Sequence, residues 1–169
     1  KGQTRLQAQA SQAEGGFALQ GFSLDNPQIR AEAQGSFTDG AMDAQARLAV
    51  PDLAVLGRGW SGGFEADAEL RQHDGAQIVQ LTGRGRDLAL GQTGVDGALT
   101  GMTDLTLLAE QRGAVITLRN LRLENDQLDA QAEGVWGAGV TDLTAHADIR
   151  SLASFGTGWA GSLNADASF

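Results

Sequence analysis

Residues 29–37, IRAEAQGSF, place an apolar or small residue at every second position and a polar one between them. This period of two is typical of a β-strand with one buried face, because successive side chains of a strand point to opposite faces. Residues 128–136, LDAQAEGVW, repeat the pattern. Both stretches therefore predict strands with one apolar face and one wet face.

These two stretches belong to a longer internal match. Residues 22–70 align without a gap with residues 121–169, and eighteen of the 49 positions are identical. Glycines and apolar residues supply most of the identities, so the repeated unit is a backbone shape and not a set of reactive groups. We expect one continuous, repeat-built β segment over residues 1–169, with copies at 22–70 and 121–169. Because the second copy stops at Phe169, we also expect a piece of a longer array.

Further stretches alternate in the same way, at residues 6–10, 42–50, 64–70, 143–149 and 163–169. Glycine-containing pairs between the strands predict tight hairpins, and hence an antiparallel meander, at Asp39-Gly40, Asp74-Gly75, Arg112-Gly113 and Ala138-Gly139. The apolar phase slips at Gln20-Gly21 and at Arg119-Asn120, which predicts a β-bulge at each place. Only residues 51–60 and 150–159 lose alternation, and we expect a loop or a single helical turn there.

No amphipathic helix is evident that could cover the apolar face, so the sheet must fold onto itself or leave a trough for an apolar ligand. We expect an all-β fold, an elongated antiparallel sheet curled into an apolar groove, with a flattened sandwich as the alternative. The expected groove lining consists of Ile29, Ala31, Ala33, Met42, Ala44, Ala46, Leu48, Phe64, Ala66, Leu128, Ala130, Ala132, Leu143, Ala145, Ala147 and Leu163.

Composition narrows the possible partners. A net charge of -9 argues against nucleic acid and against anionic lipid head groups, since both need a basic surface. The chain has no cysteine and therefore no disulfide or thiolate metal site. No apolar run approaches the roughly 20 residues of a membrane-spanning helix.

Few residues invite a chemical role. His73 and His146 lack a second histidine at ligand spacing, so we expect both to be solvent-exposed and predict neither a metal site nor a cofactor. The acidic residues are spread singly over the wet strand faces, and no nucleophile motif accompanies them. We therefore expect no catalytic residues and no enzymatic activity.

Two glycine-rich stretches and two tryptophans have competing interpretations. The stretches 83–86, GRGR, and 57–60, GRGW, lack the strand-to-helix context of phosphate sites, and the second becomes GTGW at 156–159, so we expect turn glycines. Trp60 and Trp159 could mark a lipid interface, but we favour an aromatic plug at the end of a small β core.

Three features of the chain can be compared with known families. They are the long strands of the form apolar-x-Ala-x-Ala-x-Gly, the connection DLAVLGRGWSG at 52–62, and DLALG at 87–91 followed by VDGALTG at 95–101. Together they resemble the TamB family of the translocation and assembly module, within the AsmA-like group. The resemblance covers nearly the whole chain. It implies a β-taco rod in the periplasm of Gram-negative bacteria, anchored to the inner membrane by a segment outside this chain. It also implies phospholipid acyl chains as cargo and an outer-membrane barrel as a partner of the full-length protein.

Three functions follow as hypotheses. The first is a conduit whose apolar groove shelters phospholipid acyl chains on their way from the inner to the outer membrane. The second is a scaffold that offers strand edges to outer-membrane proteins during assembly. The third is a secreted adhesin or stalk with a closed core. An open apolar trough would favour the conduit. An unprotected edge strand would favour the scaffold, and a dry, filled interior would favour the stalk.

Overall fold

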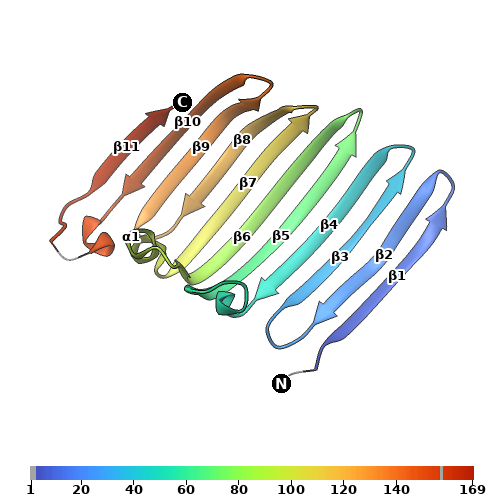
Figure 1. Cartoon of the computed structure of the whole chain (residues 1–169), viewed down its shortest axis with the longest axis horizontal. Helices are drawn as coiled ribbons and strands as arrows, with labels where there is room; N and C mark the ends of the chain where they lie inside the picture. The colour runs from blue at the N-terminus through green and yellow to red at the C-terminus, as the bar shows by residue number, and fades with distance from the viewer. Residues whose placement is uncertain (1–2, 157) are drawn as a thin grey trace.

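The computed structural model describes residues 3–156 and 158–169. Its strands form one antiparallel sheet in which each strand pairs with its neighbours in sequence, as the meander prediction requires (Figure 1). In chain order they are β1 (Arg5–Ala13), β2 (Gly16–Asp25), β3 (Arg30–Thr38), β4 (Ala41–Val50), β5 (Trp60–His73), β6 (Ala76–Leu90), β7 (Met102–Arg112), β8 (Val115–Glu124), β9 (Leu128–Gly137), β10 (Val140–Ile149) and β11 (Leu163–Ser168).

The expected turns connect these strands. Asp39-Gly40, Asp74-Gly75 and Ala138-Gly139 each have positive φ at both residues, the geometry of the type I′ turn whose twist matches the flanking strands. The fourth expected turn is displaced by one residue, because β7 continues through Arg112 and β8 begins only at Val115.

Both predicted bulges are confirmed. The pairing of β2 with β3 shifts register between Leu19 and Phe22, and that of β8 with β9 shifts between Leu118 and Leu121. The partner strands β1 and β7 shift opposite the same bulges. Because a bulge inserts an unpaired residue, it keeps the apolar side chains before and after it on one face of the sheet.

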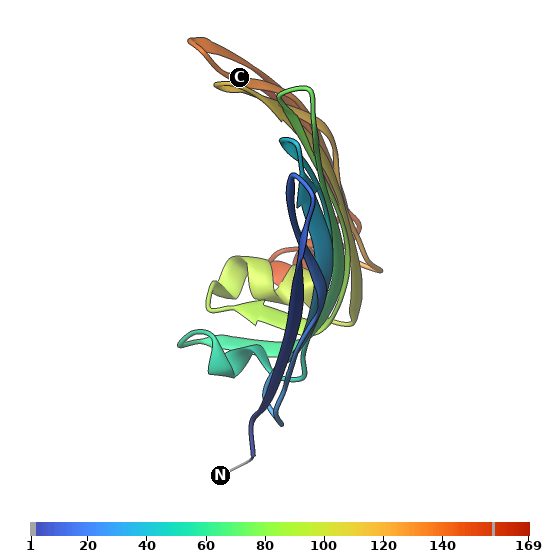
Figure 2. The ribbon, with the colours of Figure 1, turned by 90° about the vertical axis from the view of Figure 1, so that its right-hand side faces the viewer.

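The sheet is curled, and in edge view its hollow side faces the short helices (Figure 2). The expectation of a curled antiparallel sheet is confirmed, whereas the alternative of a flattened sandwich is not what forms, since the strands make a single sheet. The accessible surface is 11051 Å². A compact monomer of 17.6 kDa exposes about 7,900 Å². The excess reflects a layer that leaves both of its faces largely open.

Four short helices gather on the concave side at one end of the strands (Figure 2): η1 (Leu53–Val55), α1 (Thr93–Asp96), η2 (Gly97–Leu99) and η3 (Leu152–Phe155). η1 and η3 confirm the expected single turns, while α1 and η2 were not expected. Buried apolar residues of the described chain gather here: Leu53 lies in η1, Ala98 and Leu99 lie in η2, and Val50 ends β4. No helix of the described residues has the length and apolar character needed to cross a bilayer.

The helices η1, α1, η2 and η3 together form a helical cap, and the buried side chain of Asn125 links this cap to the sheet by hydrogen bonds. Its Nδ2 donates to the carbonyl oxygen of Ala98, at 2.7 Å, and to Oγ1 of Thr103, at 3.0 Å. Its Oδ1 accepts from the backbone N–H groups of Gln127 and Leu128, both at 2.7 Å. All of its hydrogen-bonding capacity toward protein is used, as a buried amide requires.

Elements of the two aligned stretches correspond in the structure. β2, β3, β4, η1 and β5 have their counterparts 99 residues later in β8, β9, β10, η3 and β11. Asn26 accepts from the N–H groups of Gln28 and Ile29 in the same way as Asn125 does from its neighbours. Positions 99 residues apart can therefore be compared as matched sites.

Two sequence-based interpretations are wrong. Gly83 and Gly85 are not turn glycines but lie inside β6, where a Cβ at Gly83 would meet the ring of Phe64 and one at Gly85 would meet Leu88. Glycine is needed there because large side chains pack directly over the backbone.

The tryptophans do not plug a core either. Trp60 is 40% exposed and Trp159 is 62% exposed, whereas Leu53 of η1 is buried. Gly59 and Gly158 do occupy turns with positive φ, as expected. Thr157 lies outside the described residues.

Candidate functional site

The concave face is built from apolar rows that run across the strands. Strand pairing places side chains of one face side by side, so a row can be followed from β1 to β11. The central row consists of Ala8, Phe22, Ala33, Ala46, Ala68, Leu81, Leu107, Leu121, Ala132, Ala145 and Ala167. The next row towards the helices consists of Leu6, Leu24, Ala31, Leu48, Ala66, Gly83, Leu105, Leu123, Ala130, Ala147 and Ala165. Neither row contains a polar side chain.

The structure brings the residues expected to line a groove together on this face. Ile29 directly precedes β3, and the others lie in strands: Ala31 and Ala33 in β3, Met42, Ala44, Ala46 and Leu48 in β4, Phe64 and Ala66 in β5, Leu128, Ala130 and Ala132 in β9, Leu143, Ala145 and Ala147 in β10, and Leu163 in β11. For the residues in strands, the common face follows from the register of the strand pairs.

Sequence reasoning missed the middle of the face. β6, β7 and β8 contribute a block of large aliphatic side chains: Val79, Leu81, Leu105, Leu107, Leu118, Leu121 and Leu123. The alternation of residues 105–109, LTLLA, was a signal for β7. In β6 the glycines at 83 and 85 obscured the apolar alternation.

The ends of the strands differ. At one end the helical cap covers the face, and Val50 and Thr103 are each 2% exposed. At the opposite end the face finishes in an open lip, where Phe17 is 56% and Trp136 is 59% exposed. The rings of Phe17 and Phe37 stack at 5.9 Å along this lip. Between cap and lip most side chains are half-buried or exposed, as expected for an apolar face over which the described residues form no second layer, and Ala66 is an exception at 8% exposed.

A hollow of about 340 Å³ lies in the concave face over β8–β11. Its apolar lining consists of Leu121, Leu123, Ala130, Ala132, Ala145, Ala147, Ala165 and Ala167. Alanines form the floor because their side chains extend one carbon from the backbone, and the two leucines of β8 rise at its inner side. This arrangement can accept an apolar group but offers it no hydrogen bond.

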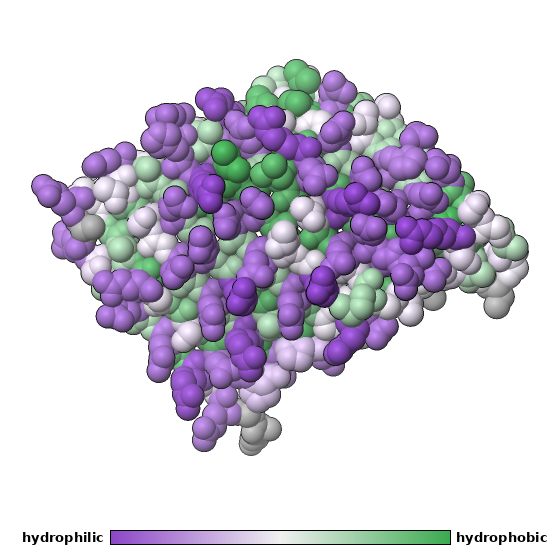
Figure 3. Space-filling model, turned by 180° about the vertical axis from the view of Figure 1, so that it is seen from behind, coloured by the Kyte–Doolittle hydropathy of each residue, from purple (hydrophilic) through white to green (hydrophobic). Residues whose placement is uncertain are grey.

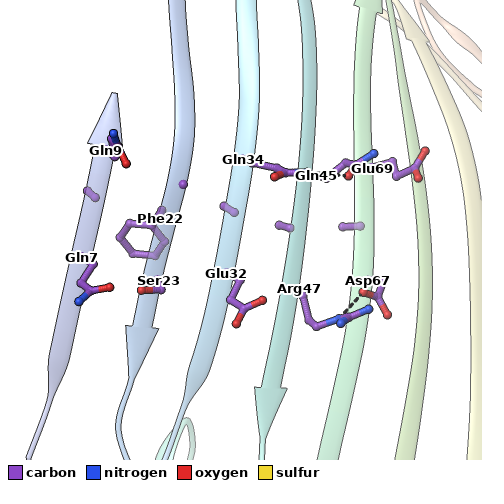
Figure 4. A pocket seen from close by; sticks show the side chains of 15 residues that line it. Gln7, Gln9, Phe22, Ser23, Glu32, Gln34, Gln45, Arg47, Asp67 and Glu69 are labelled. Atoms are coloured by element: carbon purple, nitrogen blue, oxygen red, sulfur yellow. Dashed lines mark hydrogen bonds and ion pairs between the residues drawn. The ribbon is translucent and has the colours of Figure 1, made fainter. Parts of the chain in front are cut away.

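The convex face is polar (Figure 3). Ion pairs cross neighbouring strands on it, with Nε of Arg47 2.7 Å from Oδ1 of Asp67 and Nε of Arg84 2.8 Å from Oδ1 of Asp104. Each carboxylate raises the pKa of its partner guanidinium, mainly through the hydrogen bond and to a smaller extent through its negative charge. A furrow of about 710 Å³ between two rows of these side chains spans β1–β5 (Figure 4). Glutamine and charged side chains form its two walls, which is typical of a solvated face.

Glu110 is the most enclosed of these ionic groups. Its side chain is 18% exposed and accepts from Arg119, at 2.7 Å, and from Arg112, at 3.3 Å. The hydrogen bond from Arg119 and then that from Arg112 lower the pKa of the Glu110 carboxyl below its ordinary value. This carboxylate is held in its charged form by structural partners on the convex side.

The two histidines are exposed, as expected. His73 lies 3.1 Å from the neighbouring Asp74, and Nδ1 of His146 lies 2.8 Å from Oδ1 of Asp166. The second pair occupies the position of Arg47 and Asp67 in the first stretch. Among the described residues, no three His, Cys, Asp or Glu side chains gather closely enough to hold a metal ion.

Comparison with models of known protein families, with curated proteins and with solved structures finds no match to this chain.

Proposed function

We propose that the concave face shelters the acyl chains of phospholipids, and that the protein acts as a segment of a lipid conduit between membranes. The observation that carries this proposal is the continuity of the apolar surface. Along two rows from β1 to β11 it contains no polar side chain, and within the described residues no second layer covers it. Exposing such a surface to water costs about 25 cal/mol per Å², so an apolar occupant is favoured.

The shape of the face selects among apolar occupants. A second copy of the sheet could meet it only along the rims, because two concave surfaces do not fit together and the helical cap stands between them (Figure 2). A peptide strand would bring backbone N–H and C=O groups for which the two rows offer no partner. A hydrocarbon chain needs no such partner, and the conduit is therefore the function that this geometry supports best.

The same proposal includes a place of action. A groove for acyl chains is useful where lipid must cross an aqueous compartment, so we infer a location in the periplasm, an inner-membrane anchor elsewhere in the full chain and a barrel partner at the outer membrane. These inferences extend the TamB-like sequence features described above.

A pair of neighbouring residues provides the test. Leu163 and Asn164 of β11 lie on opposite faces of the sheet, and both are exposed. A photoreactive phenylalanine analogue is placed at each position in turn, and each protein is irradiated with phospholipid that carries a radiolabelled acyl chain. We expect adducts at position 163 and none above background at position 164. Equal labelling, or none at either position, would refute the conduit.

A scaffold for outer-membrane proteins is the second candidate, and one observation favours it. Within the described residues, β1 pairs only with β2 and β11 only with β10, so the outer edge of each carries free backbone groups. Such edges can accept an added strand. Peptides copied from strands of barrel proteins, added at increasing concentration, should then protect the amides of β1 or β11 from hydrogen exchange.

A further inference from the structure

We propose that the hollow over β8–β11 is a discrete site for a single acyl chain, so that lipid rests at one place on the concave face and does not spread evenly along it. This inference rests on the proposed function and adds where the chain binds and which residues create the site.

The dimensions of the hollow fit one hydrocarbon chain. From β8 to β11 there are three inter-strand spacings of about 4.8 Å, which together span about 14 Å. The hollow is open on its outer side, and its lining residues stand in two rows that are two residues, or about 7 Å, apart along each strand. An α-helix with its side chains is about 10–12 Å wide and does not fit. An extended acyl chain lying across the strands does.

The matched positions of the first stretch explain why the hollow forms here. Six of the eight apolar positions that line it have the same residue 99 positions earlier, but Leu121 corresponds to Phe22 and Ala147 corresponds to Leu48. Both differences make the first stretch bulkier. The two stretches share their strand pairing, so the larger side chains over β2–β5 fill space that stays open over β8–β11, where β11 also forms an edge of the described sheet.

The leucines of the central strands separate the two surfaces. Leu81, Leu107 and Leu121 continue the central row between its alanines, and Leu105 and Leu123 do the same in the next row. Each leucine extends farther from the backbone than alanine, so these strands raise a ridge across the concave face. An acyl chain in the hollow therefore meets a wall on its β8 side.

A reciprocal exchange tests the site. A photoreactive phenylalanine analogue is placed either at Leu163 or at its counterpart Phe64, in wild-type, Ala147→Leu and Leu48→Ala backgrounds. Leucine is tolerated by this backbone, since Leu48 occupies the matched position, and circular dichroism verifies the fold of each protein. The probe is a phospholipid with a radiolabelled acyl chain in vesicles of phosphatidylethanolamine and phosphatidylglycerol.

We expect adducts at position 163 to exceed those at position 64 in wild type. Ala147→Leu should reduce the yield at 163 at least about tenfold, because its added carbons take the space of several methylene groups of the chain. Leu48→Ala should raise the yield at 64. If Leu48→Ala does not fold, the Ala147→Leu result decides alone.

The outcomes separate the two proposals. Equal yields at 163 and 64 in wild type, or an Ala147→Leu protein that still labels fully at 163, would overturn the discrete site and leave the conduit standing. No adduct at either position would overturn both.

Discussion

Replacing Ala130 by aspartate tests whether the concave face is open to water. Ala130 is half-buried and is flanked across the sheet by Leu123 and Ala147, and no second layer of the described chain lies above it. A carboxylate at this position can stay hydrated from the open side. We therefore expect the substitution to lower the free energy of unfolding by about 1 kcal/mol, which is the range that strand propensities span. In a protein of this size that corresponds to a decrease of about 2–4 °C in the melting temperature.

Val50→Asp is the matched comparison under the helical cap. Val50 is 2% exposed, so its replacement loses about 1.5–3 kcal/mol of apolar burial and also places a carboxylate where water cannot reach it. The combined cost is a large part of the free energy of unfolding, which is roughly 8–25 kcal/mol for a chain of 169 residues. Thermal melting followed by circular dichroism, with acyl-chain labelling at Leu163, measures both proteins.

The expected result is an Ala130→Asp protein that folds and captures less lipid, beside a Val50→Asp protein that is largely unfolded at 37 °C. If Ala130→Asp unfolds as completely as Val50→Asp, the face is covered in solution and the reasoning fails. If it melts normally and captures lipid at the wild-type level, Ala130 does not line the lipid path.

Three further predictions concern the fold. Asn125→Ala should lower the free energy of unfolding by about 2–4 kcal/mol, since it leaves buried hydrogen-bonding partners unsatisfied. Asn26→Ala removes only the hydrogen bonds of a turn and should lower it by about 1 kcal/mol. Urea titration of the two variants measures the difference. Gly85→Ala should cost about 1–3 kcal/mol through overpacking, while Gly21→Ala, with nothing within 4 Å of its added carbon, should be nearly neutral in the same assay. Glu110 has a lowered pKa in the folded state, so its stabilisation is present above the unfolded value of about 4.3 and is lost as the pH falls through the folded one. The urea midpoints of wild type and Glu110→Gln should therefore differ more at pH 6 than at pH 3.

The period of two predicted the strands and their shared face because it is a local property of the chain. The slip at residues 20–21 likewise predicted its bulge, since only an inserted residue keeps Leu19 and Phe22 on one side. The pattern could not distinguish a curled single sheet from a sandwich, because a strand has the same apolar face whether a second sheet or an acyl chain covers it.

Other elements depend on distant residues and were missed for that reason. Residues 93–99, TGVDGAL, contain two glycines and have no helical period of their own, yet they form α1 and η2 under the hydrogen bond from Asn125 to Ala98. The glycines at 83 and 85 were assigned to a turn because nothing nearby in the sequence shows that Phe64 and Leu88 pack above them. The hollow over β8–β11 forms partly because Ala147 is smaller than its counterpart Leu48. The two residues can be compared only after both are known to occupy matched positions in the sheet.

The unbroken order of the strands governs how the chain reaches its fold. The most widely separated partners in the sheet are Ala76 and Arg112, only 36 residues apart, so every ladder closes a short loop. Sheets assembled from such local pairings have a low contact order for an all-β protein and reach the folded state faster than sandwiches, whose strands must find distant partners. Each hairpin is also held mainly by the one before and the one after it, which makes unfolding a progressive loss of strands from either end. For the proposed location in the periplasm, this order would let the part of the chain that has already crossed the inner membrane form its sheet while the remainder is still extended.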